Sequence, residues 1–147
     1  ARLFGLRVPE NFLHPYFQNN ITDFWRHWHI SLYTWLIDYV YIPLGGSRVP
    51  FRHILLNIFL VMIVSGIWHG AAWNFILWGG WHGIMLVTHR IYSDKMVPTL
   101  HPFLVTSFPA KAAAYLVTML GVWIGWMIFM WSIKDLQIIF SLLTGRT

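Results

Sequence analysis

Two histidines in the middle of the chain share a local pattern that is suited to proton transfer. His69 and His82 each follow a tryptophan and precede a glycine, thirteen residues apart, in a segment without Asp, Glu, Lys or Arg. An ionisable side chain in so apolar a segment costs free energy unless it faces a cavity or a partner, which makes each histidine a functional hypothesis. A neutral imidazole accepts a proton near pH 7, as general base catalysis on a hydroxyl group requires. The pattern therefore suggests general base catalysis on a hydroxyl group, a step that acyl transfer from a thioester to an alcohol needs.

A structural interpretation of the same residues stays open at this point. Each imidazole can instead bond a carbonyl or hydroxyl group inside a helix bundle, and this alternative is stronger for His82, which lies nearer the end of its segment. A histidine that stands alone in an apolar stripe, as His29 does, is likewise more often a packing residue than a reactive one. We assign no role to four further histidines, which fall in predicted loops or on polar faces: His27, His53, His89 and His101.

Other reaction types lack the residues that they need. The chain has no cysteine, which excludes disulfides, thiolate metal sites and a thiol nucleophile. There is no His-Glu-x-x-His zinc motif, no Gly-x-Ser-x-Gly elbow, and Gly45-Gly46-Ser47-Arg48 lacks the ending of a phosphate loop. The basic residues are dispersed, which argues against nucleic acid as a partner. We therefore expect neither a metal nor a bound cofactor.

The elements that carry these histidines are expected to lie in a membrane. Hydrophobic residues make up 57% of the 147 residues and charged residues 10%, against about 25% charged in typical soluble domains. Two segments without charge, residues 53–89 and 112–133, each exceed the length of one membrane span. The second predicts one transmembrane helix over 112–133. Glycines divide the first, which predicts a pair of short or re-entrant helices over 54–88 that turns near 66–70 and places His69 at membrane depth.

An amphipathic helix is predicted over residues 22–40, with Asn20 or Thr22 as its cap and Pro43 beyond its end. One face of this helix combines an aromatic and aliphatic stripe with a single histidine: Trp25, Trp28, His29, Leu32, Trp35, Leu36 and Tyr39. Such a stripe can rest at the lipid headgroups or pack on other spans. The expected class is all-α: one polytopic membrane domain over 1–147, with an N-terminal amphipathic interfacial helix.

The basic residues suggest an orientation in the membrane. Under the hairpin interpretation, residues 1–53 and 89–111 lie on one side and carry eight of the ten basic residues, including Arg2 and Arg7. Basic residues accumulate on the cytoplasmic side, so these segments are predicted to be cytoplasmic. A single tilted helix over 53–89 would put them on opposite sides. Three prolines in 89–111 predict a loop there.

Two long motifs resemble those of the bacterial membrane-bound O-acyltransferases. Residues 24–32 (FWRHWHISL), continued by 38–46 (DYVYIPLGG), look like the family signature, and residues 66–74 (GIWHGAAWN) resemble the segment with its invariant histidine. The similarity is greatest to the subgroup that acetylates alginate and peptidoglycan. It implies the C-terminal part of a multi-pass enzyme of the bacterial inner membrane. Such an enzyme takes an acyl group from a cytoplasmic thioester such as acetyl-CoA and passes it to an extracytoplasmic polysaccharide, often through a periplasmic or surface esterase-like partner.

The resemblance also implies roles for single residues. His69 matches the principal catalytic histidine, and His29 matches the second motif histidine. Framing or substrate-binding positions match too: Trp25, Arg26, Trp28, Trp68 and Asn74. The chain departs from the family at His27, where a second arginine is usual, and near Met130, where the family tends to have an arginine.

Two other functions remain as alternatives. The thirteen-residue spacing of His69 and His82 is similar to that of axial ligands in membrane b-type cytochromes, which would make the protein an electron carrier that binds haem. The chain could also be an inactive fragment of a helix bundle, since the family has many further spans.

Overall fold

The computed structural model describes residue 5 and residues 8–131 and 133–145. Arg2 and Arg7, two of the basic residues behind the predicted orientation, and Ser132 within the predicted span lie outside the described residues. The described part is helical with one isolated antiparallel bridge, Phe12 to Trp28, so the predicted all-α class is confirmed there. The elements are η2 (Pro15–Phe17), α1 (Ile21–His27), α2 (Ile30–Leu36), η3 (Ile37–Tyr41), α3 (Phe51–Ile67), α4 (Trp73–Ile91), η4 (Tyr92–Met96), η5 (Val97–Thr99), α5 (Pro102–Thr106), α6 (Phe108–Met130) and α7 (Ile133–Thr144).

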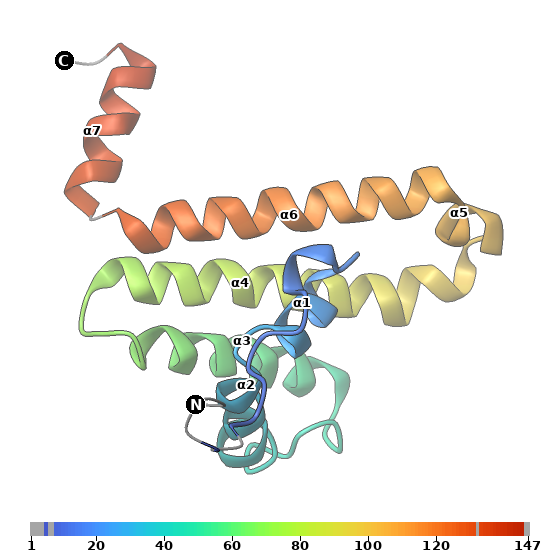
Figure 1. Cartoon of the computed structure of the whole chain (residues 1–147). Coiled ribbons are helices and arrows are strands. Elements are labelled where there is room, and N and C mark those ends of the chain that lie inside the picture. The colour runs from blue at the N-terminus through green and yellow to red at the C-terminus, as the bar shows by residue number, and fades with distance from the viewer. Residues whose placement is uncertain (1–4, 6–7, 132, 146–147) are drawn as a thin grey trace.

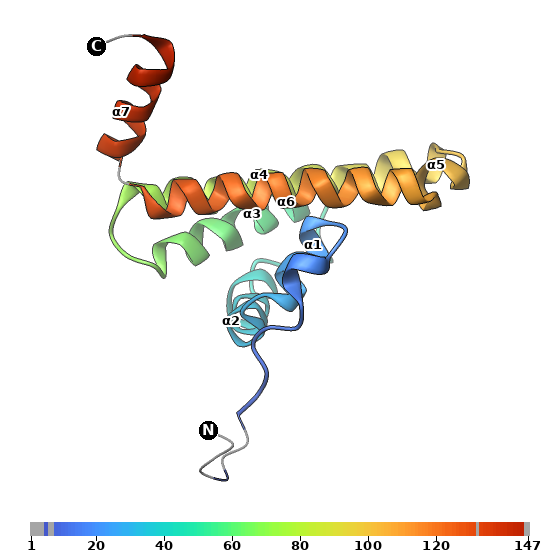
Figure 2. The same ribbon diagram turned by 45° about the horizontal axis from the view of Figure 1, so that its top comes forward.

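Three long helices form the body of the molecule. α3, α4 and α6 run antiparallel to their neighbours, with α4 in the middle, while α1 and α2 lie to one side and α7 projects away (Figure 1). Figure 2 shows the same separation of α7 from the other helices. Among the described residues, α6 is the one helix long and apolar enough to cross a membrane; α3 is apolar but shorter. α6 begins earlier than the predicted span and ends at Met130, and proline in its first turn suits a helix start.

Glycines allow α3 and α4 to approach closely. A methyl group at Gly66 would overlap the carbonyl oxygen of Phe75, and one at Gly79 would overlap the carbonyl oxygen of Met62. The two helices are joined by a turn over residues 68–72, where the glycine-divided apolar segment suggested a change of direction. This turn carries His69.

The amphipathic helix predicted over 22–40 is interrupted, which corrects that prediction. Asn20 caps α1 and accepts a hydrogen bond from the Asp23 amide at 2.8 Å, but the helix stops after His27. Residues 11–13 lie beside the break: the Leu13 amide donates to the His27 carbonyl and the Ile30 amide donates to the Asn11 carbonyl, both at 3.0 Å. These long-range bonds replace the helical bonds that periodicity alone predicts.

The break also divides the predicted apolar stripe. Trp25 and Leu36 are buried, whereas the Trp35 side chain is 46% exposed and that of Tyr39 68% exposed. Trp35 and Tyr39 stack on each other with ring centroids 5.5 Å apart. The stripe is therefore not one continuous buried face within this chain, and its interfacial location stays a prediction.

The loop predicted over 89–111 is largely helical instead. α4 continues to Ile91 and is followed by η4, η5 and α5 before α6 begins. Each proline of this segment lies in the first turn of a helix, where its missing amide proton is not needed. The prolines mark helix starts rather than an irregular loop.

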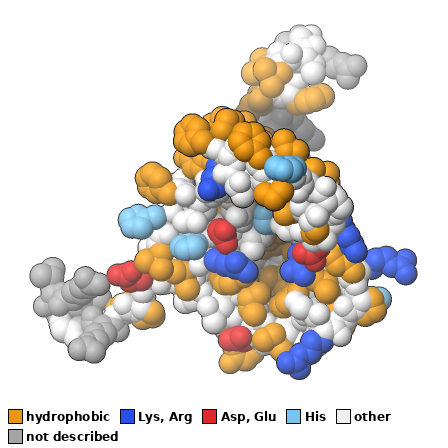
Figure 3. Space-filling view, turned by 90° about the vertical axis from the view of Figure 1, so that its right-hand side faces the viewer, with side chains coloured by type: hydrophobic (Ala, Val, Ile, Leu, Met, Phe, Trp, Pro, Cys, Tyr) orange, Lys and Arg blue, Asp and Glu red, His pale blue; other side chains and the backbone are white. Residues whose placement is uncertain are grey.

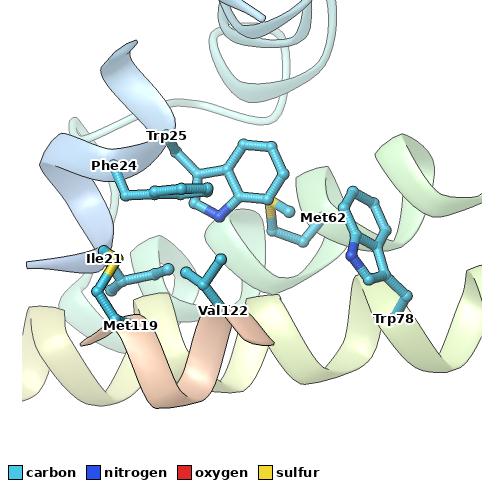
Figure 4. Close-up of a cluster of buried hydrophobic side chains, with 7 residues drawn as sticks. All are labelled: Ile21, Phe24, Trp25, Met62, Trp78, Met119 and Val122. Atoms are coloured by element: carbon cyan, nitrogen blue, oxygen red, sulfur yellow. The ribbon is translucent and has the colours of Figure 1, made fainter. Parts of the chain in front are cut away.

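A core of large side chains joins α1 to the three long helices (Figure 4). Phe24 and Val122 are fully buried and Trp78 is 1% exposed. The cluster combines residues from four helices: Ile21, Phe24, Trp25, Met62, Trp78, Met119 and Val122. This packing fixes α1, and with it the start of the histidine motif, against α3, α4 and α6.

Candidate functional site

His69 lies in the turn between α3 and α4, inside a group of aromatic rings. Its imidazole is half-buried and has ring centroids of Trp68, Phe75, Trp78 and Phe129 within 4.9–5.9 Å. Trp78 and Phe129 present their rings nearly perpendicular to it, at 89° each. Phe129 belongs to α6, so one of the rings around His69 comes from a helix that is distant in the sequence. This is an apolar setting in which a neutral imidazole is favoured over a charged one.

His29 lies at the break between α1 and α2 and reaches the same tryptophan as His69. The His29 ring centroid is 5.7 Å from that of Trp68, and the Trp68 centroid is 4.9 Å from that of His69. His29 Nδ1 is buried and has no hydrogen-bond partner among the residues that the structure describes. The two histidines of the family-like motifs, His29 and His69, therefore contact the same tryptophan ring.

The backbone of His29 is held in an unfavourable conformation. Its φ of 45° and ψ of 55° lie in the left-handed region, which costs a non-glycine residue about 1–2 kcal/mol. The surrounding hydrogen bonds to residues 11–13 maintain it. Such strain concentrates at functional sites and turns the His29 side chain out of the direction that a continuous helix would give it.

Of the predicted framing residues, the two tryptophans in α1 and at its end pack on aromatic rings, whereas the arginine between them makes a different contact. Trp25 packs on Trp78 and His82, while Trp28 stacks on Phe24 at 5.7 Å and meets Trp126 of α6 at 4.9 Å. These contacts fix the segment on either side of His29. Arg26 instead forms an ion pair with Asp23 of the same helix.

Asn74 ties the beginning of α4 to the end of α6. Its Nδ2 donates a hydrogen bond to the Phe129 carbonyl oxygen at 2.8 Å. Because the Phe129 ring covers His69, this bond positions one wall of the histidine's surroundings. Phe129 and Trp78 were missed by sequence reasoning, since only tertiary contacts place them beside His69.

His82 belongs to the core rather than to this site. Its ring is completely buried between Trp25 and Trp78, with centroids 5.1 Å away, and it packs against Gly125 of α6. His69 precedes α4 whereas His82 lies within it, so the two do not share one helix. The arrangement that suggested a pair of haem ligands on a single helix is therefore absent.

A cavity of about 450 Å³ opens between the α1–α2 segment and the α3–α4 pair. His29, Trp25 and Trp28 lie in its wall, and its inner part is apolar, with Ile58, Val61 and Met62 among its lining residues. His69 is not among its lining residues and lies next to Trp68 instead. Figure 3 shows a hollow in this side of the molecule with basic and acidic side chains around it.

The rim of the cavity carries two ion pairs. Arg26 Nη1 is 3.2 Å from Asp23 Oδ1, and Arg90 Nε is 2.9 Å from Asp94 Oδ2. A hydrogen bond with the Tyr33 hydroxyl is the main cause that raises the pKa of Arg26, which stays a cation. All four charged residues are partly exposed and line the cavity, which gives it a polar entrance above an apolar interior.

One rim residue had no role in the sequence analysis. His89 Nδ1 lies 2.9 Å from the Thr22 hydroxyl and so links the C-terminal end of α4 to α1. No pattern in the sequence indicates this contact, which joins residues 67 positions apart.

The site combines paired histidines, an apolar aromatic enclosure and a cavity with a charged rim, on a helical scaffold with an apolar span. The chain belongs to the membrane-bound O-acyltransferase family, whose model matches residues 2–131. The resemblance seen in the two motifs is thereby confirmed.

Among its relatives, the chain is 44% identical over 128 residues to the "Probable alginate O-acetylase AlgI" of Pseudomonas aeruginosa, covering 86% of this chain and 23% of that protein. It is 42% identical over 142 residues to the peptidoglycan O-acetyltransferase of Helicobacter pylori, covering 97% and 25%. A teichoic acid D-alanyltransferase of Bacillus subtilis is 33% identical over 97 residues, covering 61% and 25%. The chain spans about a quarter of the length of these relatives.

Proposed function

We propose that this chain is part of a multi-pass O-acyltransferase of the bacterial cytoplasmic membrane. It would move an acyl group, most simply acetyl, from a cytoplasmic thioester toward hydroxyl groups of an extracytoplasmic polysaccharide. Family membership and the names of relatives that act on alginate, peptidoglycan and teichoic acid support this class of reaction. The remaining spans of the enzyme would complete the enclosure around the histidines.

The observation that carries the proposal is that His29 and His69 both contact the Trp68 ring. They come from separate motifs, forty residues apart in the sequence. An imidazole in an apolar enclosure is suited to act as a general base, because it is neutral and holds a free electron pair.

In the proposed reaction, His69 takes the proton of the acceptor hydroxyl as its oxygen attacks the thioester carbonyl carbon. The new carbon–oxygen bond forms, the carbon–sulfur bond breaks, and the thiolate receives the proton. His29 positions the thioester or passes that proton on. The acyl group moves without any change of oxidation state, so the step needs neither a metal nor a redox cofactor.

The cavity beside His29 is the proposed site of the donor. Its apolar interior suits the narrow chain of a thioester, and Arg26 and Arg90 at its rim suit an anionic group such as a phosphate. Proposed partners are the lipid bilayer, the polysaccharide acceptor and an esterase-like protein outside the membrane that completes transfer.

Single substitutions in the whole membrane protein test this function. We expect His69→Ala and His29→Ala each to lower acetyl transfer by about 10²- to 10⁴-fold, the usual contribution of a general base. Transfer is measured with radiolabelled acetyl-CoA in membranes that contain equal amounts of each variant. His53→Ala, on an exposed histidine of α3, is the matched control and should retain full activity. Near-normal transfer by His69→Ala would exclude the mechanism.

A further inference from the structure

Ser65, in the last turn of α3, is a buried hydroxyl that the proposed mechanism has not used. The residue is 1% exposed, and its Oγ has no hydrogen-bond partner among the residues that the structure describes. It nevertheless lies in the wall of the 450 Å³ cavity that also contains His29. An unpaired hydroxyl in an apolar interior is unfavourable unless something else satisfies it.

Other hydroxyl groups in the helices of this chain bond to the backbone of the preceding turn. Thr34, Thr106 and Thr118 each donate to the carbonyl oxygen four residues earlier, at 2.8–2.9 Å. Ser65 does not make this bond to Val61. Its hydroxyl is thus left without a partner in the described part of the chain.

The place of Ser65 in the helix points to what a molecule in the cavity would present to it. Ser65 lies in the last turn of α3, and His69 follows directly on the end of that helix, where its amide donates to the Gly66 carbonyl. The neighbouring cavity residues Ile58, Val61 and Met62 are apolar and make no competing hydrogen bond with their side chains. A hydroxyl in this wall has a single donor to give to an oxygen atom of a ligand bound in the cavity.

We propose that the Ser65 hydroxyl donates a hydrogen bond to the acyl carbonyl oxygen of the thioester donor. This inference rests on the proposed function and adds to it a residue that positions the carbonyl for attack. The bond also polarises the carbonyl, since its oxygen gains negative charge as the acceptor oxygen adds. No proton is transferred by Ser65 itself.

The test compares donor analogues in the purified whole protein. One is the ketone analogue of acetyl-CoA in which methylene replaces sulfur, and the other is S-ethyl-CoA, which lacks the acyl carbonyl. We expect Ser65→Ala to weaken binding of the ketone by about 5- to 10-fold and to leave binding of the thioether unchanged, as loss of one hydrogen bond predicts. Equal effects on both analogues, or no effect on either, would overturn the proposal.

Activity and stability give a second readout. Ser65→Ala should lower kcat/KM for acetyl-CoA by about tenfold without lowering the melting temperature, because it removes an unpaired buried hydroxyl. Ser141→Ala, whose hydroxyl bonds to its own α7 backbone, is the control and should change neither. Full activity in Ser65→Ala together with loss in His69→Ala would refute the role of Ser65 alone. Activity in both variants would refute the proposed function as well.

Discussion

The close contact of α3 and α4 predicts opposite effects for two adjacent glycines. A Cβ at Gly79 would lie 3.1 Å from the carbonyl carbon of Met62 and closer still to its oxygen, where ordinary contact begins at 3.4 Å. Both obstacles are backbone atoms of a packed helix, so Gly79→Ala must force the helices apart. Overpacking of this kind costs about 1–3 kcal/mol. Since the turn between these helices carries His69, activity should fall along with stability.

Gly80→Ala is the matched control. A Cβ there would lie 3.8 Å from Ile63 Cδ1, which is ordinary contact, and replacing glycine within a helix gains about 1 kcal/mol of helix propensity. That gain applies to both variants, so their difference isolates the packing term. Thermal unfolding of the detergent-purified whole protein should rank Gly80→Ala at or above the wild type and Gly79→Ala below it. Equal melting temperatures for the two variants would refute the close packing.

Two further substitutions test the positioning of the site. Asn74→Leu removes the hydrogen bond to the Phe129 carbonyl and should destabilise the α4–α6 contact by about 1 kcal/mol, measured by thermal unfolding, with a loss of acetyl transfer as Phe129 moves from His69. An unchanged melting temperature would show that the bond contributes nothing. Asn20→Ala removes the cap of α1 and should cost about 0.5–2 kcal/mol, whereas Asn19→Ala, outside the cap, should cost less; equal losses would argue against the cap.

Much of the scaffold follows from local features of the sequence. Apolar segments without charge indicated the long helices, and glycines near residue 66 indicated the change of direction before α4. Asn20 and Thr22 were the two predicted caps of the first helix, and the structure has Asn20 as the cap of α1. These features depend on neighbouring residues, which is why composition and spacing reveal them. The motifs around His69 and His29 likewise identified the family, which the comparison confirmed.

The tertiary structure decided how these parts meet. Helical periodicity continued α1 through His29, but hydrogen bonds from residues 11–13 break the helix there and turn His29 toward Trp68. Helical periodicity reflects only the spacing of residues within one segment, so it contains no information on hydrogen bonds that a distant segment makes. For the same reason it could not place Phe129 against His69, pair Thr22 with His89, or show that the hydroxyl of Ser65 is left unpaired in a cavity wall.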